Sequence, residues 1–397
     1  MAGLRLALIG CGGMARGHLR AYQAIREKEP ALFRLAAVCD VDLVRAQAFA
    51  AEAGAWQEET PHVYATPEEM LAAEEALDAA DICVPHFEHH RVGLLCLEHG
   101  INVEVEKPIG ITVKATWRLI EGAQRAGLIL ATAENIRRQP GPRTARWLLQ
   151  ERRALGEPRL FVSQRSQYQA PKADARWVWR SDRLFGGGGP VLDSGAHFCD
   201  TIRYLFGDVD RVYAEVRHQQ ARPVLRDGQS VLDQREDMLA VTLTFSSGLV
   251  GLWMLSTGLP GHDFNEVAYY GAAGALVDPG DVFHGPRLTA VIRRPGQPEQ
   301  TLEQWYPEYL SGLDPAVRAR LFPHGLTNGV ALEVYEFLDA IRRRRTPEVD
   351  GMTGLKAKSI AWAIYESAAA GRAVRVADVE SGRVDAAQRE INWRWVI

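Results

Sequence analysis

Residues 4–15 read LRLALIGCGGMA, a short apolar run that is followed at once by a glycine-rich turn. A nearly continuous apolar run of this kind is typical of a β-strand that is buried on both faces. The residues after the glycines, to about Ile25, have a helical pattern. A strand, a tight turn and a helix begin a βαβ unit, so this stretch predicts a doubly wound α/β domain at the N-terminus.

The alternation of strand-like and helix-like segments continues to about residue 134. Strands separated by helices pair in parallel through right-handed crossovers, so we expect a Rossmann domain over residues 1–134. Apolar runs typical of buried strands lie at 33–39, 80–84, 101–105 and 128–132, and helical patterns lie at 42–54, 92–99 and 112–126.

The sequence pattern changes after residue 134. Residues 238–245 and 249–255 alternate between apolar and polar side chains on either side of Ser246-Ser247-Gly248, which indicates a β-hairpin. Hairpins favour antiparallel pairing, so we expect an α+β domain over residues 135–397. Further strand-like segments lie at 209–217, 265–270 and 288–292, and helical patterns lie at 141–152, 327–345 and 354–370.

The composition excludes several classes of protein. The 397 residues carry a net charge of −4, and the one basic run, Arg342–Arg345, is typical of a solvated helix end rather than of a nucleic-acid site. No apolar stretch approaches the roughly 20 residues that span a bilayer, and the first residues lack a signal-peptide pattern. The five cysteines have no metal-binding spacing and suit a reducing compartment. We expect a cytoplasmic protein without nucleic-acid or membrane partners.

The glycine-rich turn fits the dinucleotide-binding pattern G-x-G-x-x-[GA] through Gly10, Gly12, Gly13, Met14 and Ala15. Gly10 permits the tight turn, and Gly12 lets a pyrophosphate approach the backbone closely. Ala15 keeps the helix close to the sheet, and the helix N-terminus attracts the anion. Because the pattern follows a strand and opens a helix, it indicates a dinucleotide site more strongly than an ordinary glycine turn.

Asp40 ends the second predicted strand, 25 residues after Ala15. A carboxylate at this place hydrogen-bonds the adenosine ribose of NAD and repels the 2′-phosphate of NADP. Residue 41 is a valine rather than an arginine that would hold that phosphate. We therefore expect NAD in preference to NADP, with capping of the next helix as the alternative role of Asp40.

Four motifs occur in one order along the chain: Gly10–Ala15, Val84-Pro85-His86-Phe87-Glu88-His89, Glu106-Lys107-Pro108, and the segment GGPVLDSGAHFCD at 188–200. In this order the chain resembles the Gfo/Idh/MocA family of oxidoreductases, which includes glucose–fructose oxidoreductase and inositol dehydrogenase. The resemblance implies a Rossmann domain, a C-terminal domain with an open, mostly antiparallel sheet, NAD or NADP, and a sugar, cyclitol or related polyol substrate. It also implies a homodimer or homotetramer.

The same resemblance implies roles for single residues. Lys107, Asp193 and His197 match catalytic positions. Three further residues match positions that line the nicotinamide end of the cofactor site: Pro85, His89 and Glu106. One departure is His86, since the loop after Pro85 often carries an asparagine, and this puts local nicotinamide or substrate contacts in doubt.

Oxidation of a secondary alcohol needs a base for the hydroxyl proton and an acceptor for the hydride. His197 suits the base because an imidazole titrates near neutral pH. Asp193 lies four residues earlier, so the two side chains share a helical face if both residues lie on one helix. Asp193 would then orient the imidazole or bind a substrate hydroxyl. Lys107 follows a strand end and either stabilises the substrate oxygen or, with a lowered pKa, is itself the base. Both assignments of the base stay open.

Two other groups of residues bear on the site. Trp179 and Arg180 lie in the long loop 167–189 and suit sugar rings and hydroxyls, although packing against a neighbouring domain explains them equally well. His86, His89 and His90 are poor candidates for a zinc site, because the adjacent side chains of His89 and His90 would point in different directions on most backbones. We expect no metal.

The sequence thus predicts an NAD(P)-dependent dehydrogenase or reductase that acts on the CH–OH groups of a sugar, cyclitol or polyol. One alternative is an NAD-dependent enzyme that cleaves glycosides by transient oxidation and elimination. Another is a sensor that binds dinucleotide or sugar without catalysis, which has no need of Lys107, Asp193 and His197 together.

Overall fold

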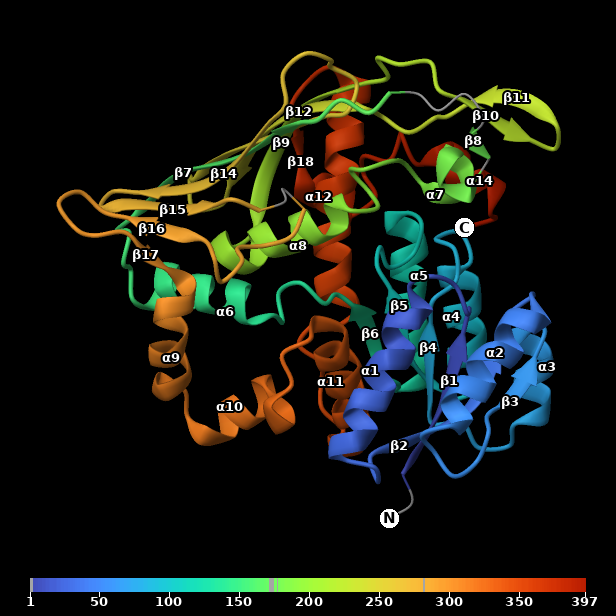
Figure 1. Cartoon of the computed structure of the whole chain (residues 1–397). Helices are drawn as coiled ribbons and strands as arrows, with labels where there is room; N and C mark the ends of the chain where they lie inside the picture. Colours follow the sequence, from blue (N-terminus) through green and yellow to red (C-terminus); the bar gives the residue numbers. More distant parts are fainter. Residues whose placement is uncertain (1–2, 171–174, 177, 281–282) are drawn as a thin grey trace. The chain divides into compact units, whose positions relative to one another are not determined.

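The computed structural model describes residues 3–170, 175–176, 178–280 and 283–397 (Figure 1). Contacts group the chain into two compact units, Met1–Arg138 with Pro315–Leu355 and Gln139–Asp314 with Lys356–Ile397. Residues 315–355, which the predicted ranges put in the second domain, therefore make their contacts within the first unit. Part of the predicted loop 167–189, namely 171–174 and 177, lies outside the described residues.

The first unit contains a six-stranded parallel sheet of order β3-β2-β1-β4-β5-β6, which confirms the Rossmann prediction. The predicted strands and helices are present within a few residues, but β3 and α3 were missed, because a three-residue strand leaves little apolar pattern to recognise. The strands are β1 (Leu4–Ile9), β2 (Phe33–Cys39), β3 (His62–Tyr64), β4 (Ala79–Ile82), β5 (Asn102–Glu106) and β6 (Leu130–Ala133). The helices are α1 (Ala15–Lys28), α2 (Leu43–Gly54), α3 (Pro67–Ala73), α4 (His89–Glu98), α5 (Val113–Ala126), α10 (Pro315–Leu321) and α11 (Gly329–Arg343).

Local signals explain where these helices begin and end. The side chain of Asp42 accepts a hydrogen bond from the backbone N–H of Arg45 and caps α2, as the sequence predicts. Thr112 caps α5 in the same way, through the N–H of Ala115. Gly100 follows the end of α4 with a φ of +78°, a conformation that favours glycine and stops the helix.

Helix α11 packs against α1 and completes the core of the first unit. Phe337 and Leu338 of α11 belong to the same buried cluster as Tyr22 and Ile25 of α1. Two segments that are more than 300 residues apart in the sequence therefore share one core.

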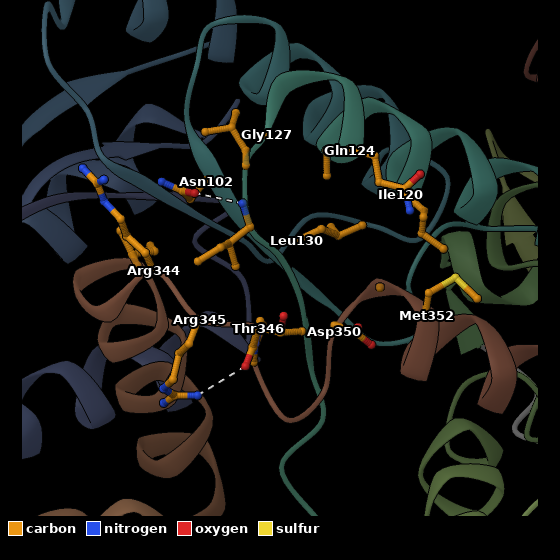
Figure 2. A pocket seen from close by; sticks show the side chains of 16 residues that line it. Asn102, Ile120, Gln124, Gly127, Leu130, Arg344, Arg345, Thr346, Asp350 and Met352 are labelled. Carbon is orange, nitrogen blue, oxygen red and sulfur yellow. Dashed lines mark hydrogen bonds between the residues drawn. The ribbon is translucent and has the colours of Figure 1, made fainter.

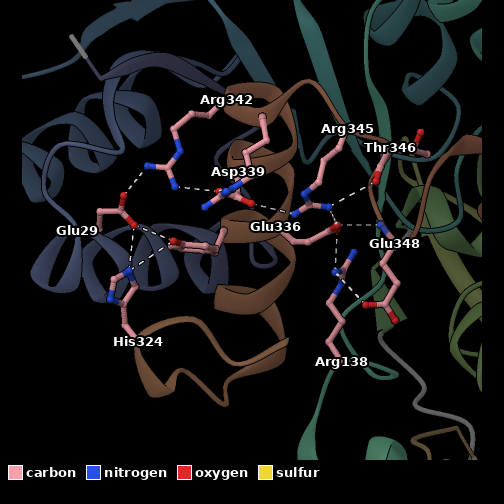
Figure 3. Close-up of polar contacts among 11 residues, drawn as sticks. Glu29, Arg138, His324, Glu336, Asp339, Arg342, Arg345, Thr346 and Glu348 are labelled. Atoms are coloured by element: carbon pink, nitrogen blue, oxygen red, sulfur yellow. Dashed lines mark hydrogen bonds and ion pairs between the residues drawn. The ribbon is translucent and has the colours of Figure 1, made fainter. Parts of the chain in front are cut away.

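A polar network reinforces this contact (Figure 3). Glu29, at the end of α1, accepts hydrogen bonds from Arg342, from the hydroxyl of Tyr335 and from His324. Burial raises the pKa of Glu29, but these three donors outweigh it and lower the pKa to about 2. Helix α11 ends at Arg343, which confirms that the arginine run lies at a helix end. Arg342 also pairs with Asp339 at 2.8 Å, so the run is not simply solvated.

The second unit contains a nine-stranded mixed sheet of order β17-β16-β15-β14-β7-β13-β12-β9-β18. Strands β7 and β13 pair in parallel and the other pairs are antiparallel, which confirms the predicted fold class and the hairpin of β12 and β13. Its strands are β7 (Pro158–Ser166), β9 (Val209–Arg217), β12 (Met238–Phe245), β13 (Val250–Ser256), β14 (Phe264–Gly271), β15 (Gly274–Asp278), β16 (Val291–Arg293), β17 (Gln300–Thr301) and β18 (Val374–Arg375).

The remaining elements of the second unit are helices and a small sheet. The small sheet has the order β11-β10-β8, and the long helix α12 is divided between the two units at residues 355 and 356. The elements are α6 (Pro140–Arg146), the π-helix Trp147–Glu151, β8 (Ala175–Arg176), the 3-10 turn Trp179–Ser181, α7 (Arg183–Gly186), α8 (Gly195–Phe206), β10 (Pro223–Arg226), β11 (Gln229–Leu232), α9 (Leu302–Gly312), α12 (Gly351–Ala370), α13 (Val376–Glu380) and α14 (Arg389–Arg394).

The large sheet is buried on one face only. On that face Phe161 of β7 packs against Phe198 and Phe206 of α8, with ring centroids 6.1 and 5.6 Å apart. The strand register places Tyr213, Val250 and Tyr270 on the opposite face, where each is more than a third exposed. Within the part of the chain that the structure describes, no helix is long and apolar enough to cross a membrane.

Candidate active site

The glycine turn after β1 is closed in on both sides by neighbouring strand ends. The N–H of Gly10 donates to the carbonyl of Cys39 at the end of β2, at 2.7 Å. A Cβ at Gly10 would lie 2.6 Å from the carbonyl oxygen of Cys83, just beyond β4, and the φ of Gly10 is +92°. Only glycine fits this position.

The next part of the turn opens outward. A Cβ added at Gly12 or Gly13 would meet no atom within 4 Å in the described part of the chain. Helix α1 starts at Ala15, its cap residue Met14 makes no side-chain capping bond, and its first turn holds no acidic residue. An uncapped helix N-terminus beside open glycine backbone fits the pyrophosphate of a dinucleotide.

Asp40 lies beside this turn, where the sequence predicts a ribose-binding carboxylate. Its side chain accepts from the backbone N–H groups of Cys11 at 2.7 Å and Asp42 at 2.8 Å. Arg45 lies 3.7 Å away. The carboxylate is therefore fixed against the glycine turn, while Asp42 caps α2.

His89 connects the two loops that follow β4 and β5. The imidazole is buried, with Nε2 2.8 Å from the carbonyl of Val84 and Nδ1 3.1 Å from the carbonyl of Pro108. Pro85 lies next to Val84, and its carbonyl accepts from the N–H of Glu88 at 2.9 Å. By holding both loops, His89 fixes the position of the turn that carries Lys107.

The side chains of Glu106 and Lys107, the two residues before Pro108, lie in different surroundings. Lys107 is half-buried at the carboxyl end of β5, the edge where open α/β sheets bind ligands. The carboxylate of Glu106 instead faces the interior, 3.2 Å from Nε2 of His18 on α1. The contact with His18 was not predicted, because nothing in the sequence links two residues 88 positions apart.

A groove in the first unit lies at the other edge of the sheet (Figure 2). Its volume is about 740 Å³, and its lining includes Asn102 and Leu130, which begin β5 and β6. Arg344, Asp350 and Met352 face them. None of the predicted site residues lines this groove.

In the second unit, a buried carboxylate holds the glycine segment before α8. Glu236 accepts from the N–H groups of Gly189 and Val191, at 2.9 and 2.8 Å, and from the hydroxyl of Tyr365 at 2.9 Å. Burial raises the pKa of Glu236, and these donors act against that rise. A Cβ at Gly188 would collide with the Tyr365 hydroxyl, so the chain passes too close to α12 for a larger residue.

Asp193 and His197 do not lie on one helix, so the condition under which they would share a helical face is not met. Helix α8 begins at Gly195, with Ser194 as its cap residue. Asp193 lies in the preceding turn, where its N–H donates to the carbonyl of Gly189 at 3.0 Å. The glycine turn, not helical spacing, therefore determines where Asp193 lies.

Asp193 has a different partner, from the long loop. Nε of Arg180 donates to its carboxylate at 2.8 Å, and the guanidinium of Arg180 lies 4.1 Å from the ring centre of Trp179. The structure thus brings together Asp193 and the two loop residues that the sequence predicts as substrate contacts.

His197 is half-buried in the first turn of α8 and stacks on a residue that the sequence analysis missed. The ring of His284 lies 6.1 Å from that of His197, with 29° between the planes. Glu236 and Tyr365 were missed as well. None of the three belongs to a motif, so only their contacts identify them.

The predicted site residues therefore form two groups. The glycine turn, Asp40, Pro85, His89 and Lys107 lie at the carboxyl edge of the first unit's sheet. Trp179, Arg180, Asp193 and His197 lie around the turn before α8 in the second unit. Their catalytic and binding roles stay predictions.

The fold and the glycine turn define a two-domain oxidoreductase with a dinucleotide-binding domain. Residues 4–134 match the oxidoreductase family's NAD-binding Rossmann fold, and residues 149–376 match its C-terminal alpha/beta domain. The chain belongs to the Gfo/Idh/MocA family of oxidoreductases, which confirms the resemblance.

Several proteins with named activities are similar to this chain. A D-apiose dehydrogenase of Paraburkholderia graminis is 30% identical over 62% of this chain and 58% of its own length. A D-glucoside 3-dehydrogenase of Escherichia coli is 27% identical over 73% of this chain and 82% of its own length. A levoglucosan dehydrogenase in complex with NADH and levoglucosan shares the fold, with a TM-score of 0.76, 22% identity, and coverage of 94% of this chain and 99% of its own.

The Glu236 contacts generate a stability prediction. In Glu236→Gln one carboxylate oxygen becomes an amide donor that faces a backbone N–H, and the charge-assisted hydrogen bonds are lost. We expect the free energy of unfolding to fall by about 1–3 kcal/mol, measured by urea denaturation. The matched control is Glu299→Gln, because Glu299 is exposed and pairs with Arg293 at the surface. Equal midpoints for the two variants would contradict this role of Glu236.

Proposed function

We propose that this protein is an NAD-dependent dehydrogenase or reductase that transfers hydride between nicotinamide and a secondary alcohol or ketone of a sugar, cyclitol or related polyol. The observation that carries the proposal is the grouping of Trp179, Arg180, Asp193 and His197 around one turn. An aromatic face with several hydrogen-bonding groups suits a polyhydroxylated ring. The names of the similar dehydrogenases, for D-apiose and D-glucosides, support the same substrate class.

The cofactor site fits a bound NAD, with the glycine turn at the pyrophosphate, Asp40 at the ribose, and Pro85 and His89 around the nicotinamide end. The resemblance also assigns Glu106 to this end, but its carboxylate faces the interior, towards His18. The nicotinamide supplies the hydride acceptor or donor. The preference for NAD over NADP rests on Asp40, whose charge opposes a 2′-phosphate. Its two backbone donors hold it in place for that role.

In the oxidation direction the substrate C–H bond breaks with its electron pair, which leaves as hydride, and the hydroxyl proton passes to a base. We assign this base to His197, while the ammonium of Lys107 holds the substrate oxygen and stabilises its developing negative charge. The alternative assigns the proton to a neutral Lys107. Asp193, paired with Arg180, binds a neighbouring hydroxyl or orients His197.

Two further parts of the proposal concern assembly and location. We propose a homodimer or homotetramer formed through the open face of the nine-stranded sheet, because Tyr213, Val250 and Tyr270 are exposed there. We propose a cytoplasmic location, which the five free cysteines support, since disulfides are rare in a reducing compartment.

The catalytic roles are tested by Lys107→Met and His197→Ala on a panel of sugars and polyols with NAD, followed through NADH absorbance. We expect each variant to lower kcat by about 100-fold or more while NADH affinity changes little, because each removes a group that acts on the reacting oxygen. Lys114→Met and His262→Ala are matched controls at exposed positions and should keep full activity.

Near-normal turnover in Lys107→Met or His197→Ala would reject that residue's role. Turnover of a nitrophenyl glycoside without net NADH formation would instead favour glycoside cleavage. If the wild-type protein binds NADH but converts no member of the panel, the sensor alternative gains support.

The cofactor preference is tested by Asp40→Ala. Removal of the carboxylate takes away a ribose hydrogen bond and the repulsion of a 2′-phosphate, so we expect the ratio of kcat/KM for NAD over NADP to fall about 10- to 100-fold. Asp42→Ala is the control, because this neighbouring carboxylate caps α2 instead. An unchanged ratio in Asp40→Ala would show that another residue sets the preference.

A further inference from the structure

We propose that a divalent transition-metal ion, with Zn²⁺ as the best match, binds between His18, Glu106 and Glu333 in the interior of the first unit. None of these three side chains takes part in the proposed hydride transfer, although Glu106 directly precedes Lys107. The sequence analysis expected no metal and did not identify these three residues, because they come from three distant elements and form no motif. His18 belongs to α1, Glu106 ends β5, and Glu333 belongs to α11.

The three side chains present their ligand atoms to one another. Nε2 of His18 lies 3.2 Å from the nearer oxygen of Glu106 and 3.9 Å from that of Glu333. One ligand atom from each residue lies within 4.8 Å of the others. A tetrahedral zinc ion with bonds of about 2.0–2.2 Å separates its ligands by about 3.4 Å, so shifts of a few tenths of an ångström would suffice for the closer pairs.

The other ring nitrogen of His18 has the partner that metal-binding histidines usually have. Nδ1 lies 2.6 Å from the carboxylate of Asp81, and that carboxylate also accepts from the hydroxyl of Tyr22. A carboxylate at Nδ1 is the usual partner of a metal-binding histidine, and it directs Nε2 towards Glu106 and Glu333. Burial lowers the pKa of His18, but the Asp81 carboxylate outweighs it and raises the pKa well above its usual range, so a proton on Nε2 competes with a metal ion for this place. Without a proton or a cation between them, Nε2 and the Glu106 oxygen would be two acceptors in contact.

Glu333 supplies an independent sign that something is bound here. Its side chain is fully buried, and neither of its oxygens has a hydrogen-bond partner among the described residues. Burial raises the pKa of Glu333, so a proton is the competing occupant. A protonated carboxyl group would still leave its O–H without an acceptor, whereas a metal ion would satisfy the oxygen directly.

The charges around the site also favour a cation. Glu104, on β5, is fully buried and its two oxygens likewise have no hydrogen-bond partner in the described part of the chain. The carboxyl groups of Glu104, Asp81, Glu106 and Glu333 are more numerous than the basic side chains near them. Arg138 is already paired with Glu336 at 3.0 Å (Figure 3).

A second group, His18 with Asp81 and Cys83, also has metal-ligand atoms close together. It fits a metal less well, because Asp81 already accepts from Tyr22 and from the thiol of Cys83. Burial raises the pKa of that thiol, which keeps the sulfur in its neutral form. An imidazole with two carboxylates is therefore the better donor set, and it suits Zn²⁺.

The experiment uses the full-length protein, stripped with EDTA, loaded with ZnCl₂ and desalted, with metal content measured by mass spectrometry and stability by thermal denaturation. We expect about one zinc per chain and a rise in Tm of several degrees, because a ligand bound only by the folded state stabilises it. Glu333→Gln should weaken zinc binding by about 10- to 100-fold and remove the rise in Tm.

Two variants serve as controls. Asp339→Asn changes a carboxylate on the same helix that pairs with arginines instead, and it should keep the zinc. Cys83→Ser should also keep it, which separates the two groups of ligands. Circular dichroism of Glu333→Gln checks that the variant is folded, and Co²⁺ absorption bands present in the wild type and absent from the variant give a second readout.

Wild-type protein that takes up no zinc would overturn the proposal and leave a shared proton as the occupant. Equal zinc content in folded Glu333→Gln would overturn it as well. Loss of zinc in Cys83→Ser, with retention in Glu333→Gln, would assign the metal to the Asp81 side of His18.

Discussion

The close passage of Gly10 between two strand ends is the constraint that determines how the loops at the carboxyl edge of the first unit's sheet are arranged. Its backbone reaches Cys39 on one side and Cys83 on the other, with no room for a side chain. Asp40 follows Cys39 and is held by the same turn. On the other side, the loop that begins at Cys83 reaches His89, which fixes the turn after β5. The turn that carries Lys107 is thereby connected to the glycine turn through the backbone around Gly10 and Cys83 and through the imidazole of His89.

In the second unit, a buried carboxylate holds the glycine segment before α8 in place. Glu236 binds two backbone N–H groups of the glycine segment, and Tyr365 closes the other side. The turn then presents Asp193 to Arg180 and leads directly into α8, where His197 lies in the first turn. In both units the predicted functional side chains lie on turns or at the ends of helices and strands, and buried contacts such as those of Gly10 and Glu236 hold these segments in place.

Local patterns were sufficient for much of the fold, because a buried strand, the Asp42 cap and the hairpin at 238–255 are encoded by neighbouring residues. The motif residues were found for the same reason. The sequence could not reveal the pairing of Glu236 with Gly189 or of His197 with His284, since these contacts join residues far apart in the chain. Whether Asp193 and His197 lie on one helix could not be decided from their spacing, because spacing alone does not show that the helix begins at Gly195.

The account depends on Lys107 and His197 acting on the same substrate oxygen. The most direct measurement is a crystal structure of the protein with NADH and a polyol identified in the substrate panel. We expect the ammonium and the imidazole both to lie within about 3 Å of one hydroxyl whose carbon faces C4 of the nicotinamide. A complex in which the two groups reach different parts of the substrate, or in which one of them lies outside the site, would contradict the account.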